Sequence, residues 1–303
     1  MSAARLSDLT LGAREVPLGG LRGLTVHRTL PQRGFPTVGA WCFVDHFGPT
    51  DQPMAVLPHP HTGLQTVTWP IAGEIRHRDS LGSDVVLRPG ELNLMTSGDG
   101  VSHSEFSVGD PDAPMHGIQL WVALPNHARS GAAAFEHHPD LPVAEGDGWT
   151  AKVLLGEVAG AVSTATTHTP IVGAEIRAQA GFSRLPLRPD FEHAILAVDG
   201  PAVVDGVDVA HRELRYLAPG RSEVGLQVPA DTILLLIGGE PFEEELVMWW
   251  NFIGRSHDDI AAARDDWQAA AERFGHVDGH GGAVIPAPPL PEVRLTPRRR
   301  SIA

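Results

Sequence analysis

The segment HPHTGLQTVTW, residues 59–69, joins a closely spaced pair of histidines to a run of residues that favours β-structure. His59 and His61 are two positions apart, and side chains at that spacing on a β-strand project from the same face. Residues 64–69, which follow them, are typical of a second short strand. The segment therefore predicts a β-protein in which two imidazoles point to one side of a strand.

A second pair of potential ligands, His103 and Glu105, has the same spacing in the segment VSHSEF, residues 101–106. If the two strands meet across a barrel, three imidazoles and one carboxylate face each other, a set that suits a first-row transition metal. A single pair of this kind is a weak signal and also fits a polar pair at a strand edge, but two pairs beside glycine-rich turns favour a metal. Four ligands leave two positions of an octahedral metal open. We therefore expect one divalent cation, with Fe(II) favoured and Zn, Mn, Ni, Co or Cu as alternatives.

The rest of the chain shows short β-type runs separated by turn residues. Its 33 glycines and 26 prolines follow no collagen-like period, which favours a sandwich or barrel of short strands. One segment, about residues 256–274, favours a helix, because Ser256 can cap its start and Gly275 can end it. We predict an all-β fold with this C-terminal helix, followed by an extended proline-rich tail.

The two halves of the chain look like weak copies of each other. Residues 71–73 (IAG) correspond to residues 198–200 (VDG) at an offset of 127, and residues 88–90 (RPG) to 218–220 (APG) at an offset of 130. The repeat predicts two similar domains, residues 1–145 and 146–303. Applied to the four potential ligands, the offsets lead to residues that cannot bind a divalent metal, so the second domain is predicted to be metal-free: Pro186, Arg188, Ile233 and Leu235.

The overall charge and the single cysteine limit the classes of function. A formal net charge of −14 disfavours direct binding to nucleic acid or to an anionic membrane. The basic run at residues 298–300 is expected to be a solvated tail. Cys42 cannot form an internal disulfide and is expected to be buried. Because the sequence shows no signal peptide and no apolar run of membrane-spanning length, the expected location is the cytoplasm.

The sequence lacks a G-x-S-x-G elbow, a Walker loop, a dinucleotide-binding G-x-G-x-x-G and an H-E-x-x-H motif. We expect His77 and Asp79 to be structural, with a place at the mouth of the metal pocket as the alternative. His116 is expected to be structural, with a place beside the metal ligands as the less favoured alternative. Three aromatic residues are expected to form an apolar contact between the domains: Trp249, Trp250 and Phe252.

Six segments together resemble the pirin family of the cupin superfamily: WCFVDHFGP (41–49), HPHTGLQTVTW (59–69), GEIRHRDSLG (73–82), PGELNLMTSGDGVSHSEF (89–106), GIQLWVALP (117–125) and MWWNFIGRSHDD (248–259). The resemblance implies two tandem cupin β-barrels of jelly-roll type, packed face to face, with one metal, usually iron, in the first barrel. Residue by residue, the family's metal ligands fall on four intact positions of this chain: His59, His61, His103 and Glu105.

Two functions follow from the resemblance. The first is quercetin 2,3-dioxygenase activity on a flavonol-like small molecule, in which Glu105 accepts the proton of a metal-bound hydroxyl. The second is a non-enzymatic, redox-sensing regulator that binds a metabolic enzyme or a transcription factor. Open coordination positions favour the enzyme. One residue departs from the family: Gln65 stands where a glutamate is usual. Gln65 is four positions from His61, so we expect it to share the face of His61 and to remove a negative charge, or a hydrogen-bond acceptor, near the metal.

Overall fold

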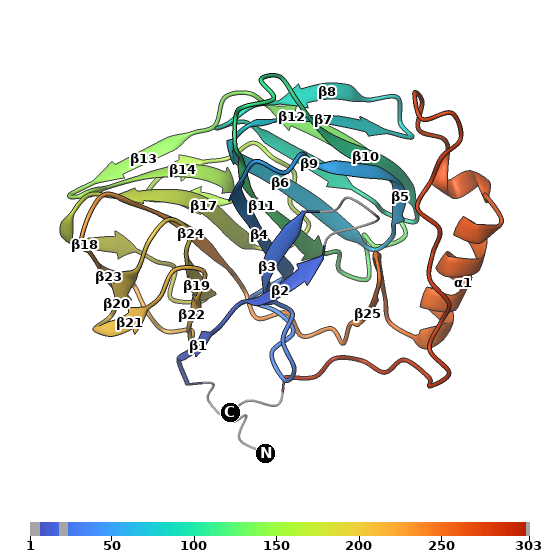
Figure 1. Cartoon of the computed structure of the whole chain (residues 1–303). Helices are drawn as coiled ribbons and strands as arrows, with labels where there is room; N and C mark the ends of the chain where they lie inside the picture. Colours follow the sequence, from blue (N-terminus) through green and yellow to red (C-terminus); the bar gives the residue numbers. More distant parts are fainter. Residues whose placement is uncertain (1–6, 18–23, 301–303) are drawn as a thin grey trace, which may run out of the picture.

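The computed structural model describes residues 7–17 and 24–300, and its strands form two barrels of the same plan (Figure 1). In the first barrel a seven-stranded sheet faces a four-stranded sheet. In order across the larger sheet, the strands are β12 (Ala134–His138), β9 (Leu92–Thr96), β6 (Leu64–Ala72), β11 (Met115–Ala123), β4 (Trp41–Thr50), β3 (Thr25–Leu30) and β2 (Arg14–Pro17). The smaller sheet holds β5 (Ala55–His61), β10 (Val101–Val108), β7 (Glu74–Asp79) and β8 (Asp84–Leu87).

The second barrel repeats this arrangement. Its larger sheet has the order β1 (Leu9–Leu11), β22 (Leu214–Leu217), β19 (Glu192–Ala197), β24 (Thr232–Gly239), β17 (Ile171–Ala178), β14 (Trp149–Leu155) and β13 (Val143–Gly146). Its smaller sheet holds β18 (Gly181–Pro186), β23 (Glu223–Val228), β20 (Ala202–Val204) and β21 (Val207–Val209). Two short hairpins lie outside these sheets: β15 (Glu157–Val158) with β16 (Ala161–Val162), and β25 (Val247–Trp249) with β26 (Phe252–Gly254).

The two larger sheets pack against each other and bury one shared apolar core. It joins side chains of both barrels, such as Leu120 of β11 and Ile237 of β24. Two tryptophans also donate hydrogen bonds across the interface: Trp41 Nε1 to the carbonyl of Val172 (3.0 Å), and Trp69 Nε1 to Glu175 Oε2 (2.9 Å). Burial of polar tryptophan atoms is favourable only when they find such partners. The prediction of two cupin barrels packed face to face is confirmed.

The predicted helix is present but shorter than expected. Helix α1 (His257–Gln268) begins with a capping box in which the Ser256 side chain accepts from the backbone of Asp259. It ends at Gln268, and Ala270 then adopts a left-handed φ of 51°, which breaks the helical path. A short 3-10 helix, η1 (Glu272–Phe274), follows. Figure 1 shows α1 beside the edge of the first barrel near β5 and β10.

Two segments cross between the halves that the sequence defined. Strand β1 pairs with β22 in the second barrel, whereas α1 and the segment around it lie against the first barrel (Figure 1). The division at residues 145 and 146 stays a prediction. The expected solvated tail is wrong for Arg300, whose Nη1 lies 2.6 Å from Oε2 of the fully buried Glu192. A carboxylate enclosed between the barrels requires a cation, which the tail provides.

The sequence repeat is real, but its second offset is wrong. The strand equivalent to β10 is β23, which pairs with β18 as β10 pairs with β5. Ile233 and Leu235 lie on β24, in the other sheet. The buried positions of β23 carry apolar side chains, Val224 and Leu226, which belong to the core of the second barrel. The absence of a metal from that barrel stays a prediction.

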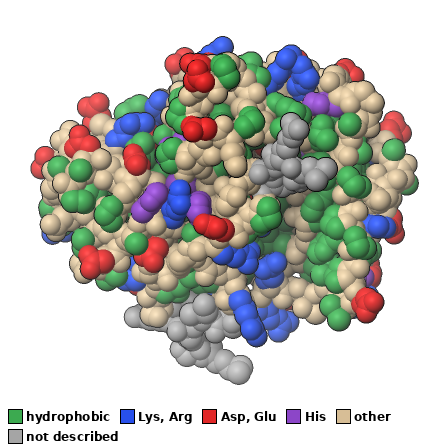
Figure 2. Space-filling view, in the orientation of Figure 1, with side chains coloured by type: hydrophobic (Ala, Val, Ile, Leu, Met, Phe, Trp, Pro, Cys, Tyr) green, Lys and Arg blue, Asp and Glu red, His purple; other side chains and the backbone are tan. Residues whose placement is uncertain are grey.

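The surface charge is unevenly distributed. In Figure 2, lysine and arginine side chains gather in the lower middle of the visible face, while acidic side chains are scattered over the rest of it. This local gathering contrasts with the formal net charge of −14. Within residues 7–17 and 24–300, no helix has the length and apolar character needed to cross a bilayer. Cys42 is buried, as predicted, and burial raises the pKa of its thiol.

Candidate metal centre

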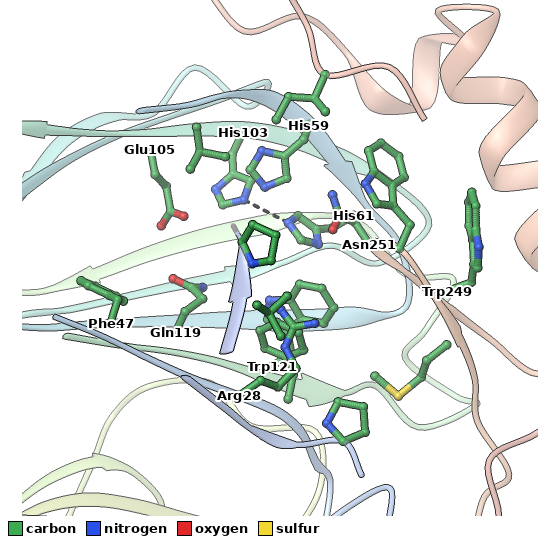
Figure 3. A pocket seen from close by; sticks show the side chains of 18 of the residues that line it. Arg28, Phe47, His59, His61, His103, Glu105, Gln119, Trp121, Trp249 and Asn251 are labelled. Atoms are coloured by element: carbon green, nitrogen blue, oxygen red, sulfur yellow. Dashed lines mark hydrogen bonds between the residues drawn. The ribbon is translucent and has the colours of Figure 1, made fainter. Parts of the chain in front are cut away.

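The four predicted ligand positions lie on two adjacent strands of the smaller sheet in the first barrel. Strands β5 and β10 run antiparallel, and His59 is the direct partner of His103. The pairing shifts at a β-bulge between His103 and Glu105. A bulge redirects the side chains around it. Figure 3 shows His59, His61, His103 and Glu105 projecting into the same interior space.

The spacing of the imidazoles fits a cation. The Nε2 atoms of His61 and His103 are 3.1 Å apart, and the rings of His59 and His103 have centroids 4.4 Å apart. Two nitrogens bound to one metal at about 2.1 Å and at right angles are separated by about 3.0 Å. Ligand atoms of His59, His61 and His103 all lie within 4.8 Å of one another. The buried cluster could therefore hold a metal ion.

The protonation of the imidazoles also suits a metal. Burial lowers the pKa of His59 to about 4, and it lowers the pKa values of His61 and His103 well below the usual value. The rings are therefore neutral near pH 7, as metal ligands must be. His59 Nδ1 lies 2.9 Å from the carbonyl oxygen of Leu57. That oxygen can only accept, so Nδ1 carries the proton and Nε2 keeps its lone pair.

Glu105 lies beside the cluster on β10, where its ligand atom is within 4.8 Å of those of His103 and His77. Its carboxylate is buried, and Oε1 accepts a hydrogen bond of 2.9 Å from the Thr68 hydroxyl on β6. Burial raises the pKa of Glu105, because the enclosed site disfavours the negative charge. A cation beside the carboxylate would offset this cost. Glu105 thus has the environment of a group that either binds a metal or exchanges a proton.

A cavity of about 370 Å³ opens onto this cluster. That volume lies within the range of about 300–1,000 Å³ that is usual for small-molecule sites. Its wall combines the histidines and Glu105 with apolar and aromatic side chains, including Phe47, Trp121, Trp249 and Trp250. Trp249 and Trp250, which were expected to form an apolar contact between the domains, pack against α1 and line this cavity instead. Their segment returns to the first barrel and forms part of the cavity wall (Figure 3).

Basic side chains also line the cavity. Arg14, Arg28 and Arg298 contribute to its wall, and Arg28 pairs with Asp45 at 2.7 Å while its guanidinium lies 4.2 Å from the centre of the Phe43 ring. Burial lowers the pKa of Arg298, and the charges of Arg14 and Arg28 lower it further. The three cations therefore lie near one another. They would attract a negatively charged ligand to an otherwise acidic protein.

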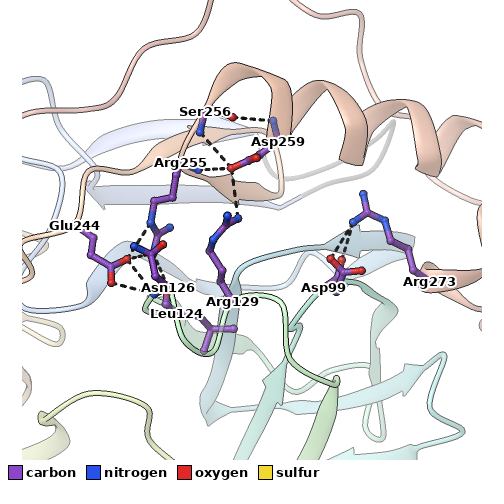
Figure 4. Close-up of polar contacts among 9 residues, drawn as sticks. All are labelled: Asp99, Leu124, Asn126, Arg129, Glu244, Arg255, Ser256, Asp259 and Arg273. Atoms are coloured by element: carbon purple, nitrogen blue, oxygen red, sulfur yellow. Dashed lines mark hydrogen bonds and ion pairs between the residues drawn. The ribbon is translucent and has the colours of Figure 1, made fainter.

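A polar network fixes the aromatic segment to the first barrel (Figure 4). Arg255 donates to Glu244 Oε2 (3.0 Å) and to the carbonyl of Leu124 (2.8 Å), and Arg129 lies 3.4 Å from Asp259. Arg129 and Leu124 follow β11 of the first barrel. The other three residues belong to the C-terminal segment around β25, β26 and α1: Glu244, Arg255 and Asp259. The network holds this wall of the cavity in place.

One sequence expectation about neighbouring residues is wrong, that for Gln65, and for His116 the less favoured alternative is excluded. Gln65 does not share the face of His61, because a turn at Gly63 (φ 72°) separates β5 from β6. Its amide donates to Thr96 Oγ1 (2.9 Å) and to the carbonyl of Thr166 (3.1 Å), away from the ligand cluster. His116, offered as a possible neighbour of the ligands, lies instead beside His46, with their Nε2 atoms 2.8 Å apart.

His77 and Asp79 were expected to be structural, and the structure gives them a closer relation to the cluster. Both side chains are buried, and they lie on β7 opposite β10. Ligand atoms of His77, His103 and Glu105 lie within 4.8 Å of one another. The motif spacing could not reveal this contact, because it depends on which strand pairs with β10.

Comparison with known proteins agrees with this geometry. The family model "Pirin" matches residues 23–122, and the model "Pirin C-terminal cupin domain" matches residues 172–275. A Pseudomonas aeruginosa protein provisionally named a quercetin 2,3-dioxygenase is 45% identical, over 92% of this chain and 89% of its own length. A pirin-like protein from Caulobacter vibrioides is 36% identical, over 94% of this chain and 99% of its own length.

A solved structure supports the same assignment. The crystal structure of quercetin 2,3-dioxygenase from Acinetobacter baumannii superimposes with a TM-score of 0.90 at 42% identity, and covers 95% of this chain and 98% of that one. The match extends over both barrels and therefore over the strands that carry the histidine cluster. With two family models matched in tandem and a buried cluster suited to a metal, the chain belongs to the pirin family of bicupins.

Proposed function

We propose that this chain is a mononuclear iron-dependent dioxygenase that opens the central ring of quercetin-like flavonols. His59, His61, His103 and Glu105 would hold the Fe(II). The observation that carries this proposal is the 3.1 Å separation of two imidazole Nε2 atoms at the end of a cavity of about 370 Å³. The similarity to quercetin 2,3-dioxygenases supports the choice of substrate class.

The cavity wall suits a planar, acidic aromatic molecule. Phe43 and Trp121 are stacked with ring centroids 4.0 Å apart, and Trp121 in turn contacts His61 edge-on at 5.2 Å. Aromatic faces of this kind bind flat rings through burial and stacking. Arg14, Arg28 and Arg298 would favour a flavonol that has lost a phenolic proton. The wall therefore orients the ligand with its polar edge toward the histidines.

Glu105 is the proposed proton acceptor. When bound, Fe(II) would supply open coordination positions and lower the pKa of a hydroxyl group placed on it. Glu105 Oε1 is already occupied by the Thr68 hydroxyl, so Oε2 remains available to take the proton of the flavonol hydroxyl. The enclosing side chains keep bulk water from the resulting anion. In the overall reaction one dioxygen is consumed, the ring opens and carbon monoxide is released.

The test uses the full chain loaded anaerobically with Fe(II), followed by quercetin and oxygen. We expect loss of flavonol absorbance together with release of carbon monoxide. His103→Ala should abolish both, whereas His116→Ala should retain activity, because His116 is an equally buried histidine that points away from the cluster. If fully loaded wild-type protein leaves quercetin unchanged, the proposed activity is wrong.

The redox-sensing regulator stays a prediction as the second function. It uses the same ligands, and the present geometry contains no observation that favours it over catalysis. Comparing partner capture by the Fe(II)- and Fe(III)-loaded full chain would test it. Identical partners for both forms would count against it.

A further inference from the structure

A pair of buried residues lies directly behind the proposed metal ligands. Strand β7 is the neighbour of β10 on the side away from β5, and it sets Asp79 opposite His103 and His77 opposite Glu105. The exposed fractions are 2% for His77 and 3% for Asp79. Burial of a carboxylate at this level requires partners that stabilise its charge. Neither residue has a role in the proposed reaction.

The hydrogen bonds of Asp79 fix the protonation of its partner. Oδ1 accepts from the backbone amides of Leu81 (2.9 Å) and Ser83 (3.0 Å), and Oδ2 lies 3.0 Å from His77 Nε2. Because Oδ1 accepts from two backbone amides, the hydrogen bonds favour the ionised form of the carboxylate. The ionised carboxylate only accepts hydrogen bonds, so His77 Nε2 must donate.

The proton position in His77 then determines that of His103. With its proton on Nε2, a neutral His77 has a lone pair on Nδ1, and this atom lies 3.4 Å from His103 Nδ1. His103 can satisfy that lone pair only by carrying its own proton on Nδ1. Its Nε2 is then unprotonated, and Nε2 is the atom that faces His61 at 3.1 Å. The proton is thereby kept off the nitrogen that a metal would need.

The ring of His77 is also held in place. Phe135 on β12 stacks on it with centroids 4.4 Å apart and planes 16° apart. This stacked contact opposes a 180° flip of the ring, which would replace both nitrogens by carbons at the positions facing Asp79 and His103. On strand β5 the tautomer of His59 is fixed by a backbone group, because its Nδ1 donates to the carbonyl of Leu57. The tautomer of His103 is instead fixed by side chains, those of His77 and Asp79.

We propose that Asp79 and His77 form a positioning relay that holds His103 in the tautomer with its proton on Nδ1, and so prepares its Nε2 to bind the metal. This inference rests on the proposed metal site. Hydrogen-bond partners behind metal-bound histidines change metal affinity by about 10- to 100-fold when they are removed. Neither His77 nor Asp79 touches the substrate in this scheme.

The first experiment observes the tautomer directly, without metal or flavonol. Long-range ¹H–¹⁵N correlation spectra of the metal-free wild-type protein at pH 7.5 should show His103 with Nδ1 protonated. Asp79→Asn should shift His103 to a mixture of both tautomers. Asp84→Asn is the matched control, because it removes a half-exposed carboxylate from the neighbouring strand β8. Wild-type His103 protonated on Nε2 would overturn the proposal.

The second experiment measures affinity for Co(II) and Fe(II) by competition with a chelator. We expect Asp79→Asn to weaken binding by about 10- to 100-fold and Asp84→Asn by less than twofold. His77→Gln should lose less affinity than His77→Leu, because the glutamine carbonyl can still accept from His103 Nδ1. A purely structural role predicts no such difference. Unchanged affinity in folded Asp79→Asn and His77→Leu proteins would refute the relay.

These readouts separate the relay from the proposed activity. If wild-type protein binds Fe(II) and shows the expected tautomer but leaves quercetin intact, the dioxygenase proposal fails and the relay stands. If His103→Ala binds metal as tightly as the wild type, the metal site itself is wrong and the relay fails with it. If Asp79→Asn does not fold, the difference in metal affinity between His77→Gln and His77→Leu decides whether the relay exists.

Discussion

The buried pair of Arg300 and Glu192 provides a sharp test of how the tail contributes to stability. The Glu192 side chain is fully buried between the barrels, and it accepts from the Tyr216 hydroxyl (2.8 Å) and the backbone amide of Gly39 (2.5 Å). Arg300 supplies its cation through Nη1 (2.6 Å) and Nη2 (2.9 Å) and also lies over the Phe35 ring at 4.8 Å. Removal of one partner from a buried pair costs about 3–5 kcal/mol. We expect Arg300→Ala to lower the free energy of unfolding by that amount, as measured by urea denaturation.

Two further variants identify the cause. Arg299→Ala is the control, because Arg299 pairs with Glu245 at the surface and should contribute at most about 1 kcal/mol. Adding Glu192→Gln to Arg300→Ala should recover part of the loss, since it removes the uncompensated buried charge. A loss below 1 kcal/mol for Arg300→Ala, or a double variant less stable than the single one, would refute the reasoning.

Three other predictions follow from the structure. Thr68→Val, which removes the hydroxyl bonded to Glu105, should weaken Fe(II) binding by about tenfold in chelator competition; unchanged affinity would contradict it. Acid should destabilise the metal-free protein. Burial lowers the pKa of His193 to about 4 and the pKa of His46 to about 2 in the folded protein. As the pH falls below 6.5, these histidines therefore bind protons in the unfolded chain but not in the folded one. Each histidine should then remove about 2 kcal/mol of stability between pH 7 and pH 5, and His46→Asn should reduce this pH dependence in urea titrations. Arg298→Gln should raise KM for quercetin in low salt, with a smaller effect at 0.5 M NaCl; an effect independent of salt would argue against charge attraction.

The sequence predicts that the two residue pairs point to one side of their strands, because strand alternation is a local property. Spacing of two residues sets both members of each pair on one face, and the structure brings His59 and His103 together as direct partners. The same local logic fails for Gln65, because the turn at Gly63 places it on another strand of another sheet. Alternation holds only within one continuous strand.

Features that depend on strand pairing could not be predicted. His77 precedes His103 by 26 residues, and only the register of β7 against β10 brings them into contact. The repeat offset likewise led to β24 instead of β23, because loop lengths differ between the two barrels. The tail arginines were expected to be solvated, since nothing near residue 300 in the sequence indicates the distant Glu192.

The pairing of β1, from the start of the chain, with β22 of the second barrel has a practical consequence for expression and engineering. Strand β1 covers the edge of β22. Without β1, the backbone N–H and C=O groups along that edge would be unpaired and free to bond to a strand of another molecule. Removing β1 by shortening the protein would open that edge. Bare edges recruit strands from other molecules. Such a shortened protein should therefore self-associate, even though every residue of the metal centre is intact.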